Sequence, residues 1–404
     1  MRIAVIGLGK LGFTMANVFA FRGYNVDAYD NNLDTIKALK SNHISFKEKR
    51  LKHFYNINKK KINLYHKINP NLKKSNFIFI IVPTPSKQNF SYENKYVKNV
   101  LKNISPYIKN KKIVLTSTVS VGACNNELIP YLEKVSGFKE GKQFNFYYSP
   151  EFISLGSIIN DYLHPEIVLI GQNNTKNKSL EKFYKSICKN KPFFSVCKIE
   201  TAEITKISIN SYETYNITFM NLLSDLSDKV TNSSINIIRK NLINFFKNKN
   251  LSLPGVSYAG PCLPRDNRSL TYEFKKRKIN TSLFSSIDES NSLILKNLSK
   301  KIKAKQSNYN GMIFLGLSFK ENTNDITESP TIKIINLLNY QNIEVFDELI
   351  DDFSHINFKY IPKKIQNLNK IYSSRNKIII LMHKNIDIKK NKIHSSNFIL
   401  NPWK

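Results

Sequence analysis

One cysteine of the chain lies in a segment whose composition favours a fixed loop. Cys262 sits within YAGPCLPRD, residues 258–266, and two glycines and three prolines fall between residues 254 and 264. Such a segment is unsuited to a helix or a central strand, so we predict that Cys262 is presented on a rigid loop, with Asp266 close enough to share its site. A thiol near basic groups becomes a better nucleophile, although free cysteines are also common as buried apolar residues.

A lysine and an asparagine further up the chain could act on the same oxygen. Residues 200–230 contain no glycine or proline, which predicts one long helix. Lys206 and Asn210 are four residues apart in it and therefore share a face. The pair could bind and polarise an oxygen, but it is also compatible with an ordinary helix surface.

The N-terminus carries a motif for binding a dinucleotide. Gly7, Gly9 and Gly12 form GxGxxG after the apolar run MRIAVI and before a predicted helix, and Asp30 ends the next apolar run. The glycines permit a tight turn and a close approach of pyrophosphate to the backbone, and the helix N-terminus favours phosphate. Asp30 would accept hydrogen bonds from a ribose and repel a 2′-phosphate, so NAD is favoured over NADP. The alternative is a Rossmann-like turn that binds another ligand.

Polar residues follow two later apolar runs. TSTVSVG, residues 116–122, places Ser117 and Thr118 at a strand end, and SPEF, residues 149–152, places Glu151 beside a proline turn. In doubly wound sheets the carboxyl ends of strands face the cofactor cleft, although either segment could be only a polar strand end.

The order of apolar runs and helical patterns predicts an α/β protein. Short runs at 1–6, 25–30, 77–82, 113–117 and 168–170 alternate with helical segments, which indicates an N-terminal Rossmann-type, doubly wound parallel sheet. Strands at 312–315, 344–346 and 377–382, with a helix at 330–338, predict a smaller C-terminal Rossmann-like α/β domain. We expect domains at 1–198, 199–305 (a central long-helix region) and 306–404, and we see no internal sequence repeat.

The bulk composition excludes several classes of protein. The chain has 404 residues, 41% of them hydrophobic, which allows a large core. It begins without a signal-peptide pattern and contains no run long enough to span a membrane, so we expect no membrane partner and a cytoplasmic location. The four cysteines are scattered, which argues against a zinc site or a disulfide framework and so predicts no metal.

The formal charge of +32 could indicate a polyanion partner. Lysine is spread along the whole chain, however, and only residues 47–74 are locally dense. Nucleic-acid proteins concentrate their cations on one stripe, so we expect a solvated basic surface and no nucleic-acid partner. The net field should favour an anionic small substrate.

These motifs together resemble the UDP-glucose/GDP-mannose (nucleotide-sugar) dehydrogenase family over nearly the whole chain. The matching stretches occur in family order: GLGKLG, VPTP, STV, SPEF, AEITKISIN, GPCLPRD and GLSFKENTNDITESP. The resemblance implies NAD-dependent oxidation of a nucleotide-sugar C6 hydroxyl to a carboxylate, and a homodimer built on the central helix. It implies cofactor contacts from Gly7, Leu8, Gly9, Lys10, Leu11, Gly12, Asp30, Pro83, Thr84, Ser117 and Thr118.

The resemblance also implies roles for the remaining site residues. Cys262 would attack the aldehyde made in the first oxidation and carry it as a thiohemiacetal and then a thioester. Lys206 would stabilise an alkoxide, Asn210 would hold the sugar, and Asp266 would assist proton transfer. Glu151, with Thr118, would orient water or act as an acid or base. Substrate contacts are implied for Glu151, Phe152, Lys206, Asn210, Tyr258, Gly260, Phe319 and Lys320, the last reaching the nucleotide.

Four positions depart from the family pattern. Leu155 stands where an acidic residue is common and Thr327 where an arginine is common, while Ala259 and Arg265 replace a usual glycine and lysine. The first two put a cofactor-side hydrogen bond and a nearby cation in doubt.

Other functions stay open at this point. A non-catalytic nucleotide- or polyanion-binding protein on a dehydrogenase scaffold would suit the charge and the departures, although such a protein should have lost some catalytic residues. A two-electron 2-hydroxy-acid or 3-hydroxyacyl dehydrogenase leaves the cysteine loop and third domain unused. UDP-glucose is the favoured substrate, with UDP-N-acetylhexosamine and GDP-mannose open.

Overall fold

A computed structural model describes residues 1–46, 48, 50–386 and 388–403. The chain folds into two compact units, Met1–Ile207 and Ser208–Lys404. Lys47 and Lys49, from the dense basic stretch, lie outside the described residues. The boundary falls inside helix α8 (Ile199–Ser227), whose length confirms the single long helix predicted for residues 200–230. The division into three domains stays a prediction.

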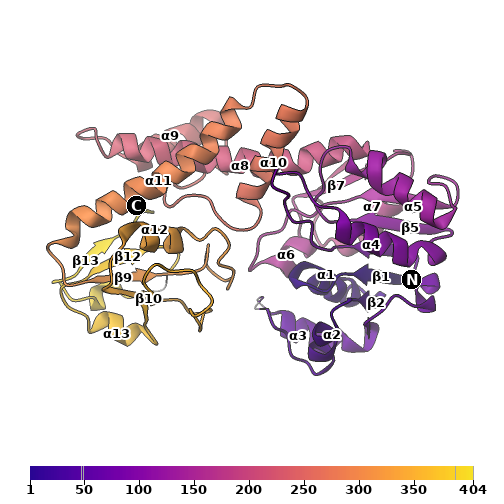
Figure 1. The fold of residues 1–404 in the computed structure, drawn as a ribbon, viewed down its shortest axis with the longest axis horizontal. Coiled ribbons are helices and arrows are strands. Elements are labelled where there is room, and N and C mark those ends of the chain that lie inside the picture. The colour runs from indigo at the N-terminus through magenta and orange to yellow at the C-terminus, as the bar shows by residue number, and fades with distance from the viewer. Residues whose placement is uncertain (47, 49, 387, 404) are drawn as a thin grey trace. The chain divides into compact units, whose positions relative to one another are not determined.

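The N-terminal unit is built on an eight-stranded sheet of order β3-β2-β1-β4-β5-β6-β7-β8 (Figure 1). Neighbouring strands are parallel except for β6 and β7. The strands are β1 (Arg2–Ile6), β2 (Asn25–Tyr29), β3 (Ile62–Tyr65), β4 (Phe77–Ile80), β5 (Lys111–Leu115), β6 (Phe144–Tyr148), β7 (Ile167–Gln172) and β8 (Phe193–Cys197). The helices are α1 (Lys10–Phe21), α2 (Leu33–Lys40), α3 (Leu51–Asn58), α4 (Lys95–Ile104), α5 (Ile129–Ser136), α6 (Ile158–Leu163) and α7 (Ser179–Ile187).

Two apolar cores lie on opposite faces of this sheet because side chains alternate along a strand. In β1, Ile3 and Val5 belong to the core with α1, α3, α6 and α7, whereas Ala4 and Ile6 belong to the core with α4 and α5. Both faces are covered, which is why these strands read as continuous apolar runs. The structure confirms the predicted doubly wound sheet.

The C-terminal unit contains a second, smaller sheet of order β11-β10-β9-β12-β13, in which all neighbours are parallel. Its strands are β9 (Met312–Leu315), β10 (Ile343–Phe346), β11 (Lys363–Lys364), β12 (Ile378–Leu381) and β13 (Phe398–Leu400). The unit's helices, besides its part of α8, are α9 (Ile235–Phe246), α10 (Leu263–Lys276), α11 (Ser282–Gln306), α12 (Pro330–Leu338) and α13 (Leu368–Tyr372). The predicted C-terminal α/β region is confirmed.

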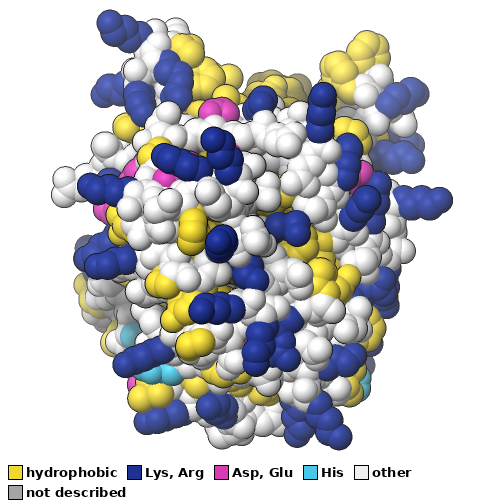
Figure 2. All heavy atoms as spheres, turned by 90° about the vertical axis from the view of Figure 1, so that its right-hand side faces the viewer, with side chains coloured by type: hydrophobic (Ala, Val, Ile, Leu, Met, Phe, Trp, Pro, Cys, Tyr) yellow, Lys and Arg dark blue, Asp and Glu magenta, His cyan; other side chains and the backbone are white. Residues whose placement is uncertain are grey.

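Within the described parts of the chain, no helix is both long and apolar enough to cross a membrane. Figure 2 shows Lys and Arg side chains spread over the visible face, with few acidic groups between them. This dispersed pattern agrees with the expected solvated basic surface, and the absence of a nucleic-acid partner stays a prediction.

A buried glutamate attaches α8 to the sheet of the N-terminal unit. Glu203 is 0% exposed, and its carboxylate accepts hydrogen bonds from the backbone N–H groups of Gly122 (2.5 Å) and Cys124 (3.0 Å). Both donors lie at the start of the turn that leads through a π-helical segment (Cys124–Leu128) into α5. Burial raises the pKa of Glu203 above its usual range, and the two donated hydrogen bonds oppose that shift. Glu203 therefore fixes the part of α8 that carries Lys206.

Replacing Glu203 tests this attachment. We expect Glu203→Ala to lower the free energy of unfolding by about 2–4 kcal/mol, because two buried N–H groups lose their acceptor. Urea unfolding followed by circular dichroism measures the effect. Glu93→Ala, which removes a half-exposed carboxylate 3.7 Å from Lys87, is the control and should cost less than about 1 kcal/mol. Equal losses in the two variants would contradict the role given to Glu203.

Candidate active site

The glycine motif forms the turn between β1 and α1 and makes room for a ligand. Gly7 has φ +97°, and a side-chain carbon there would collide with the carbonyl oxygen of Ile81. A side-chain carbon on Gly12 would collide with the carbonyl oxygen of Gly7, so this helix can approach the turn only with glycine. At Gly9, by contrast, an added carbon would meet nothing within 4 Å. The backbone is open there, at the N-terminus of α1, where a pyrophosphate is expected.

Asp30 follows β2 and lies beside the same turn. Its carboxylate accepts from the backbone N–H groups of Leu8 (2.7 Å) and Asn32 (2.8 Å). A carboxylate has about four acceptor positions, so two remain for ribose hydroxyls. The open backbone at Gly9 and the carboxylate of Asp30 together fit NAD. Lys10 and Leu11 open α1 directly after Gly9.

The turns after β4 and β5 are joined to each other by hydrogen bonds. The Thr84 hydroxyl donates to the carbonyl of Thr118 at 2.7 Å, and the Ser117 hydroxyl accepts from the backbone N–H of Val82 at 2.9 Å. Pro83 lies between these contacts. The strand order places both turns at the carboxyl edge of the sheet, on the far side of β1 from Asp30. The predicted cofactor residues thus share one edge of one sheet.

Lys206 lies beside the turn after β6. Its ammonium donates to the carbonyl oxygen of Glu151 at 2.7 Å and sits 4.6 Å from the ring centre of Phe152. The side chain is buried, so this ammonium is held in an environment of low polarity. The contact to Glu151 uses the backbone rather than the carboxylate.

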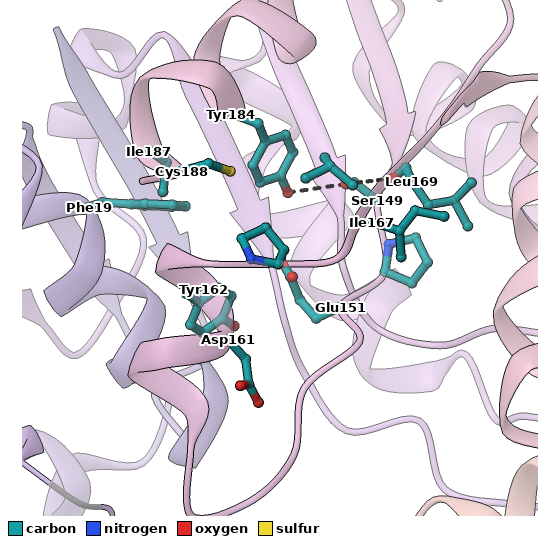
Figure 3. Close-up of a pocket in the computed structure, with 13 residues that line it drawn as sticks. Phe19, Ser149, Glu151, Asp161, Tyr162, Ile167, Leu169, Tyr184, Ile187 and Cys188 are labelled. Carbon is teal, nitrogen blue, oxygen red and sulfur yellow. Dashed lines mark hydrogen bonds between the residues drawn. The ribbon is translucent and has the colours of Figure 1, made fainter. Parts of the chain in front are cut away.

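The carboxyl group of Glu151 belongs to a small cavity of about 20 Å³ (Figure 3). Tyr162, Tyr184 and Ser149 contribute to its lining, and Ser149 donates to the Tyr184 oxygen at 3.1 Å. One carboxyl oxygen, Oε1, is buried without a hydrogen-bond partner among the described residues. Burial raises the pKa of Glu151 to about 8, although Lys206 and Tyr184 lower it in part. The neutral form of Glu151 is therefore favoured at neutral pH.

Two predicted residues meet in the C-terminal unit. The side-chain amide of Asn210, on α8, donates to Asp266 at 2.6 Å, and the Arg265 guanidinium contacts the other carboxylate oxygen at 3.0 Å. Asp266 is 0% exposed. Arg265, one of the four departures, thus orients the carboxylate that Asn210 also holds.

Cys262 is the exposed member of the four free cysteines. It lies in a turn immediately before α10, as the sequence predicted, but the rigid loop is shorter than expected. Pro264 and Asp266 belong to the first turn of α10. Proline is compatible with that position because the first N–H groups of a helix have no partner within it. The cysteine is therefore presented at a helix N-terminus.

The segment before Cys262 is held by contacts within the C-terminal unit. Gly260, with φ +83°, donates its N–H to the carbonyl of Thr327 at 3.0 Å, and a side-chain carbon on it would meet the Phe319 ring at 2.6 Å. The Lys320 ammonium lies 5.8 Å from the centre of that ring. Thr327 therefore supports the cysteine turn through its backbone, whatever side chain it carries.

Tyr258 and Leu155 are placed by other neighbours. The hydroxyl of Tyr258 donates to Asp288 at 3.0 Å, and burial raises the pKa of this phenol above its usual range. Leu155 packs against the N-terminal core. Of the predicted residues, Lys206, Glu151 and Phe152 lie together in the N-terminal unit, and Asn210 with Asp266, and Gly260 with Phe319, lie together in the C-terminal unit.

Sequence patterns did not single out Glu203, although it lies within AEITKISIN. Its partners are backbone N–H groups more than 70 residues away, to which no side-chain pattern points.

Comparisons with known proteins agree with this geometry. Three models of the UDP-glucose/GDP-mannose dehydrogenase family match in succession: the NAD binding domain at residues 1–188, the central domain at 200–293 and the UDP binding domain at 313–396. The chain is 29% identical over 379 residues to UDP-glucose 6-dehydrogenase of Rickettsia prowazekii, covering 92% of this chain and 85% of that protein.

GDP-mannose 6-dehydrogenase of Pseudomonas savastanoi pv. phaseolicola is 27% identical over 390 residues, covering 93% of this chain and 87% of that protein. The fold is similar to a UDP-glucose dehydrogenase from Pyrobaculum islandicum, with a TM-score of 0.84, 19% identity and coverage of 95% and 89% of the two chains. The chain thus belongs to the UDP-glucose/GDP-mannose dehydrogenase family: it is a nucleotide-sugar dehydrogenase, and NAD is its cofactor.

Proposed function

We propose that this enzyme oxidises the C6 hydroxyl of a nucleotide sugar to a carboxylate in two steps, with Cys262 carrying the intermediate and UDP-glucose as the substrate. The observation that carries the proposal is the exposed thiol of Cys262 at the N-terminus of α10, one helical turn before the buried Asp266. The match to UDP-glucose 6-dehydrogenase supports the choice of sugar. GDP-mannose and UDP-N-acetylhexosamines are the alternatives.

The cysteine provides a covalent route between the two oxidations. When bound, NAD⁺ supplies the hydride acceptor for each of them. The Cys262 sulfur adds to the C6 aldehyde, forming a C–S bond, and the carbonyl oxygen takes a proton to give a thiohemiacetal. Loss of the second hydride and of the hydroxyl proton leaves a thioester. Water then adds to this carbon, the C–S bond breaks, and the acid and the thiol are released. The partial positive charge at the α10 N-terminus favours the anionic sulfur.

Lysine, asparagine and aspartate have separate tasks in this scheme. The buried ammonium of Lys206 stabilises the alkoxide that forms as C6 is oxidised, since an electrostatic contact is strongest where water is excluded. Asn210 binds a sugar hydroxyl and holds Asp266, whose second oxygen is held by Arg265. Asp266 can then accept a proton during addition of the thiol or of water.

Glu151 is the acid or base, acting with Thr118 on the attacking water. A carboxyl group with a pKa of about 8 exchanges protons readily near neutral pH, as general acid–base catalysis requires. Because its carboxyl group is part of the cavity with Tyr162 and Tyr184, it must turn outward to reach a water next to Thr118.

A stoichiometry measurement tests the reaction. We expect two NADH per molecule of UDP-glucose and formation of the uronic acid. Cys262→Ala should lower the rate of acid formation by at least about a thousandfold, because the covalent route is lost. Cys197→Ala, which changes a partly buried thiol in the N-terminal unit, is the matched control and should stay active.

Each result bears on a different part of the proposal. GDP-mannose, UDP-N-acetylglucosamine and UDP-N-acetylmannosamine are tested beside UDP-glucose, and a higher kcat/KM with one of them would reassign the substrate. If no sugar yields NADH, the proposed reaction is wrong. If Cys262→Ala still forms the acid, the covalent mechanism is wrong.

The titration of Glu151 predicts a pH dependence of stability. Its pKa rises from 4.5 to about 8 on folding, so the folded protein is favoured where the group is protonated. This contribution is complete below pH 4.5 and is lost as the pH rises towards 8. Glu151→Gln cannot ionise, so its stability relative to the wild type should rise by about 2–4 kcal/mol between low and high pH.

Urea unfolding at pH 5, 7 and 9 measures this difference. Glu181→Gln is the control: hydrogen bonds to Lys185 and Lys178 lower the pKa of Glu181, so its contribution changes only at lower pH. A constant gap between wild type and Glu151→Gln would show that the carboxyl group does not titrate in this range.

The proposed homodimer has a candidate surface on α8. Five apolar side chains recur there at intervals of three and four residues, and each is at least 36% exposed: Tyr212, Tyr215, Phe219, Leu222 and Leu226. Such a continuous apolar stripe on a helix is typical of a surface that packs against another chain.

Introducing a charge into the stripe should separate the subunits. We expect Leu222→Asp to convert a dimer to a monomer in sedimentation equilibrium, because a carboxylate would be buried at the interface. Leu293→Asp, which changes a leucine of α11 that is 51% exposed, should leave the dimer intact. A wild-type monomer, or dissociation by both variants, would contradict the assignment.

A further inference from the structure

The C-terminal unit repeats the turn of the dinucleotide site without repeating its sequence. After β9, Gly316 has φ +98° and donates its N–H to the carbonyl of Phe346 at 2.8 Å. The N–H of Leu317 donates to Asp347, the residue after β10, at 2.7 Å. The first unit has the same arrangement, in which Gly7 has φ +97° and the Leu8 N–H to Asp30 distance is also 2.7 Å.

The turn after β9 differs from the turn after β1 at the position of Gly9, where the backbone of the first turn is open. Ser318 takes the place of Gly9 and is 2% exposed. Its N–H donates to Asp347 at 3.0 Å, and its hydroxyl lies 3.1 Å from the same carboxylate oxygen and 2.9 Å from the carbonyl of Lys320. The Ser318 side chain therefore occupies an acceptor position of Asp347 and covers the backbone at a point that is open at Gly9. This turn suits a different ligand contact.

His383 lies at the corresponding position on the neighbouring strand. β9 pairs with β12, and His383 is the second residue after that strand, as Val82 is after β4. A side-chain carbon on Gly316 would meet the His383 ring at 2.6 Å, so the ring packs against the glycine. The gap between β9 and β12 is where the strand order reverses, and ligands of such sheets bind there.

One nitrogen of His383 holds the turn. Its Nε2 lies 3.0 Å from the carbonyl oxygen of Ser318 and 3.3 Å from the Ser318 hydroxyl. Since a carbonyl can only accept, the shorter contact is a hydrogen bond in the tautomer with hydrogen on Nε2, which we assign here. The imidazole is buried, with 9% of the residue exposed. The donated bond thus fixes the backbone two residues before Lys320.

We propose that His383 is a positioning residue for the nucleotide part of the substrate: by donating to Ser318 it holds the turn 316–320 and sets the place of the Lys320 ammonium at the β9/β12 edge. The inference rests on the proposed function, in which Lys320 contacts the nucleotide. Phe319, between Ser318 and Lys320, packs on Gly260 of the cysteine turn, so the same turn borders the residue two places before Cys262.

Three variants at one position test the hydrogen bond. His383→Ala should raise KM for the nucleotide sugar, and Kd for its nucleoside diphosphate, about five- to tenfold. KM for NAD⁺, which binds the other unit, should not change. His383→Gln can place an amide N–H near the position of Nε2 and should restore much of the affinity, whereas His383→Asn is too short to do so. The rate of Cys262 alkylation by iodoacetamide should stay at the wild-type value in all three.

A double-mutant cycle shows whether His383 affects nucleotide binding through Lys320 or independently of it. Lys320→Ala should weaken binding, and combining it with His383→Ala should add little, because both changes remove one contact. Fully additive losses, an unchanged affinity in His383→Ala, or a failure of His383→Gln to rescue would each overturn the proposal.

The measurement of nucleotide binding tests this inference separately from the proposed reaction. Calorimetric titration with UDP and with GDP needs no turnover, so it gives a result even if no sugar is oxidised. If His383→Ala misfolds, the comparison of Gln with Asn decides the question. If the wild type binds neither nucleotide, the inference is wrong.

Discussion

The carboxylate of Glu203 is the contact on which the placement of Lys206 within the N-terminal unit depends. It joins α8 to the turn after β5 by two hydrogen bonds from backbone N–H groups in a fully buried place. One helical turn further along α8, Lys206 reaches the backbone of Glu151 after β6. The turns after two neighbouring strands are therefore tied to one helix. Loss of Glu203 would remove the contact that fixes where Lys206 lies along α8 relative to the sheet, so the role proposed for Lys206 depends on Glu203.

The carboxyl groups of Glu203 and Glu151 are both buried, but they differ in the hydrogen bonds that they accept. Glu203 accepts two backbone hydrogen bonds, which compensate much of the cost of an ionised carboxylate. Burial removes Glu151 from water, and one of its oxygens has no such donor among the described residues, so its neutral form is favoured and its pKa rises to about 8. Glu203 thus serves as an anchor, whereas Glu151 suits the acid or base role proposed for it, and the two differ in the supply of backbone N–H groups.

Sequence patterns predicted the elements that depend on local rules. Strands covered on both faces are continuous apolar runs, and the glycines of the first turn are required by sterics, so β1, β9, α12 and the turn at Gly7 could be placed in advance. The start of α10 was missed because a proline-rich stretch suggests a loop, although proline is allowed in a first turn. Glu203 and His383 were missed for another reason: both act on backbone groups distant in sequence, which leave no side-chain pattern.

The repeated turn shows why no internal repeat was visible in the sequence. A parallel strand pair followed by a tight turn needs only a residue that tolerates positive φ and an acceptor at the end of the adjacent strand. Gly7 with Asp30 and Gly316 with Asp347 meet these needs. The sequences of the two turns differ at other positions, and Ser318 stands where the first turn has Gly9. With glycine the backbone is open at that position, and with Ser318 a buried side chain occupies it, so we expect one backbone geometry to serve different ligands in the two units.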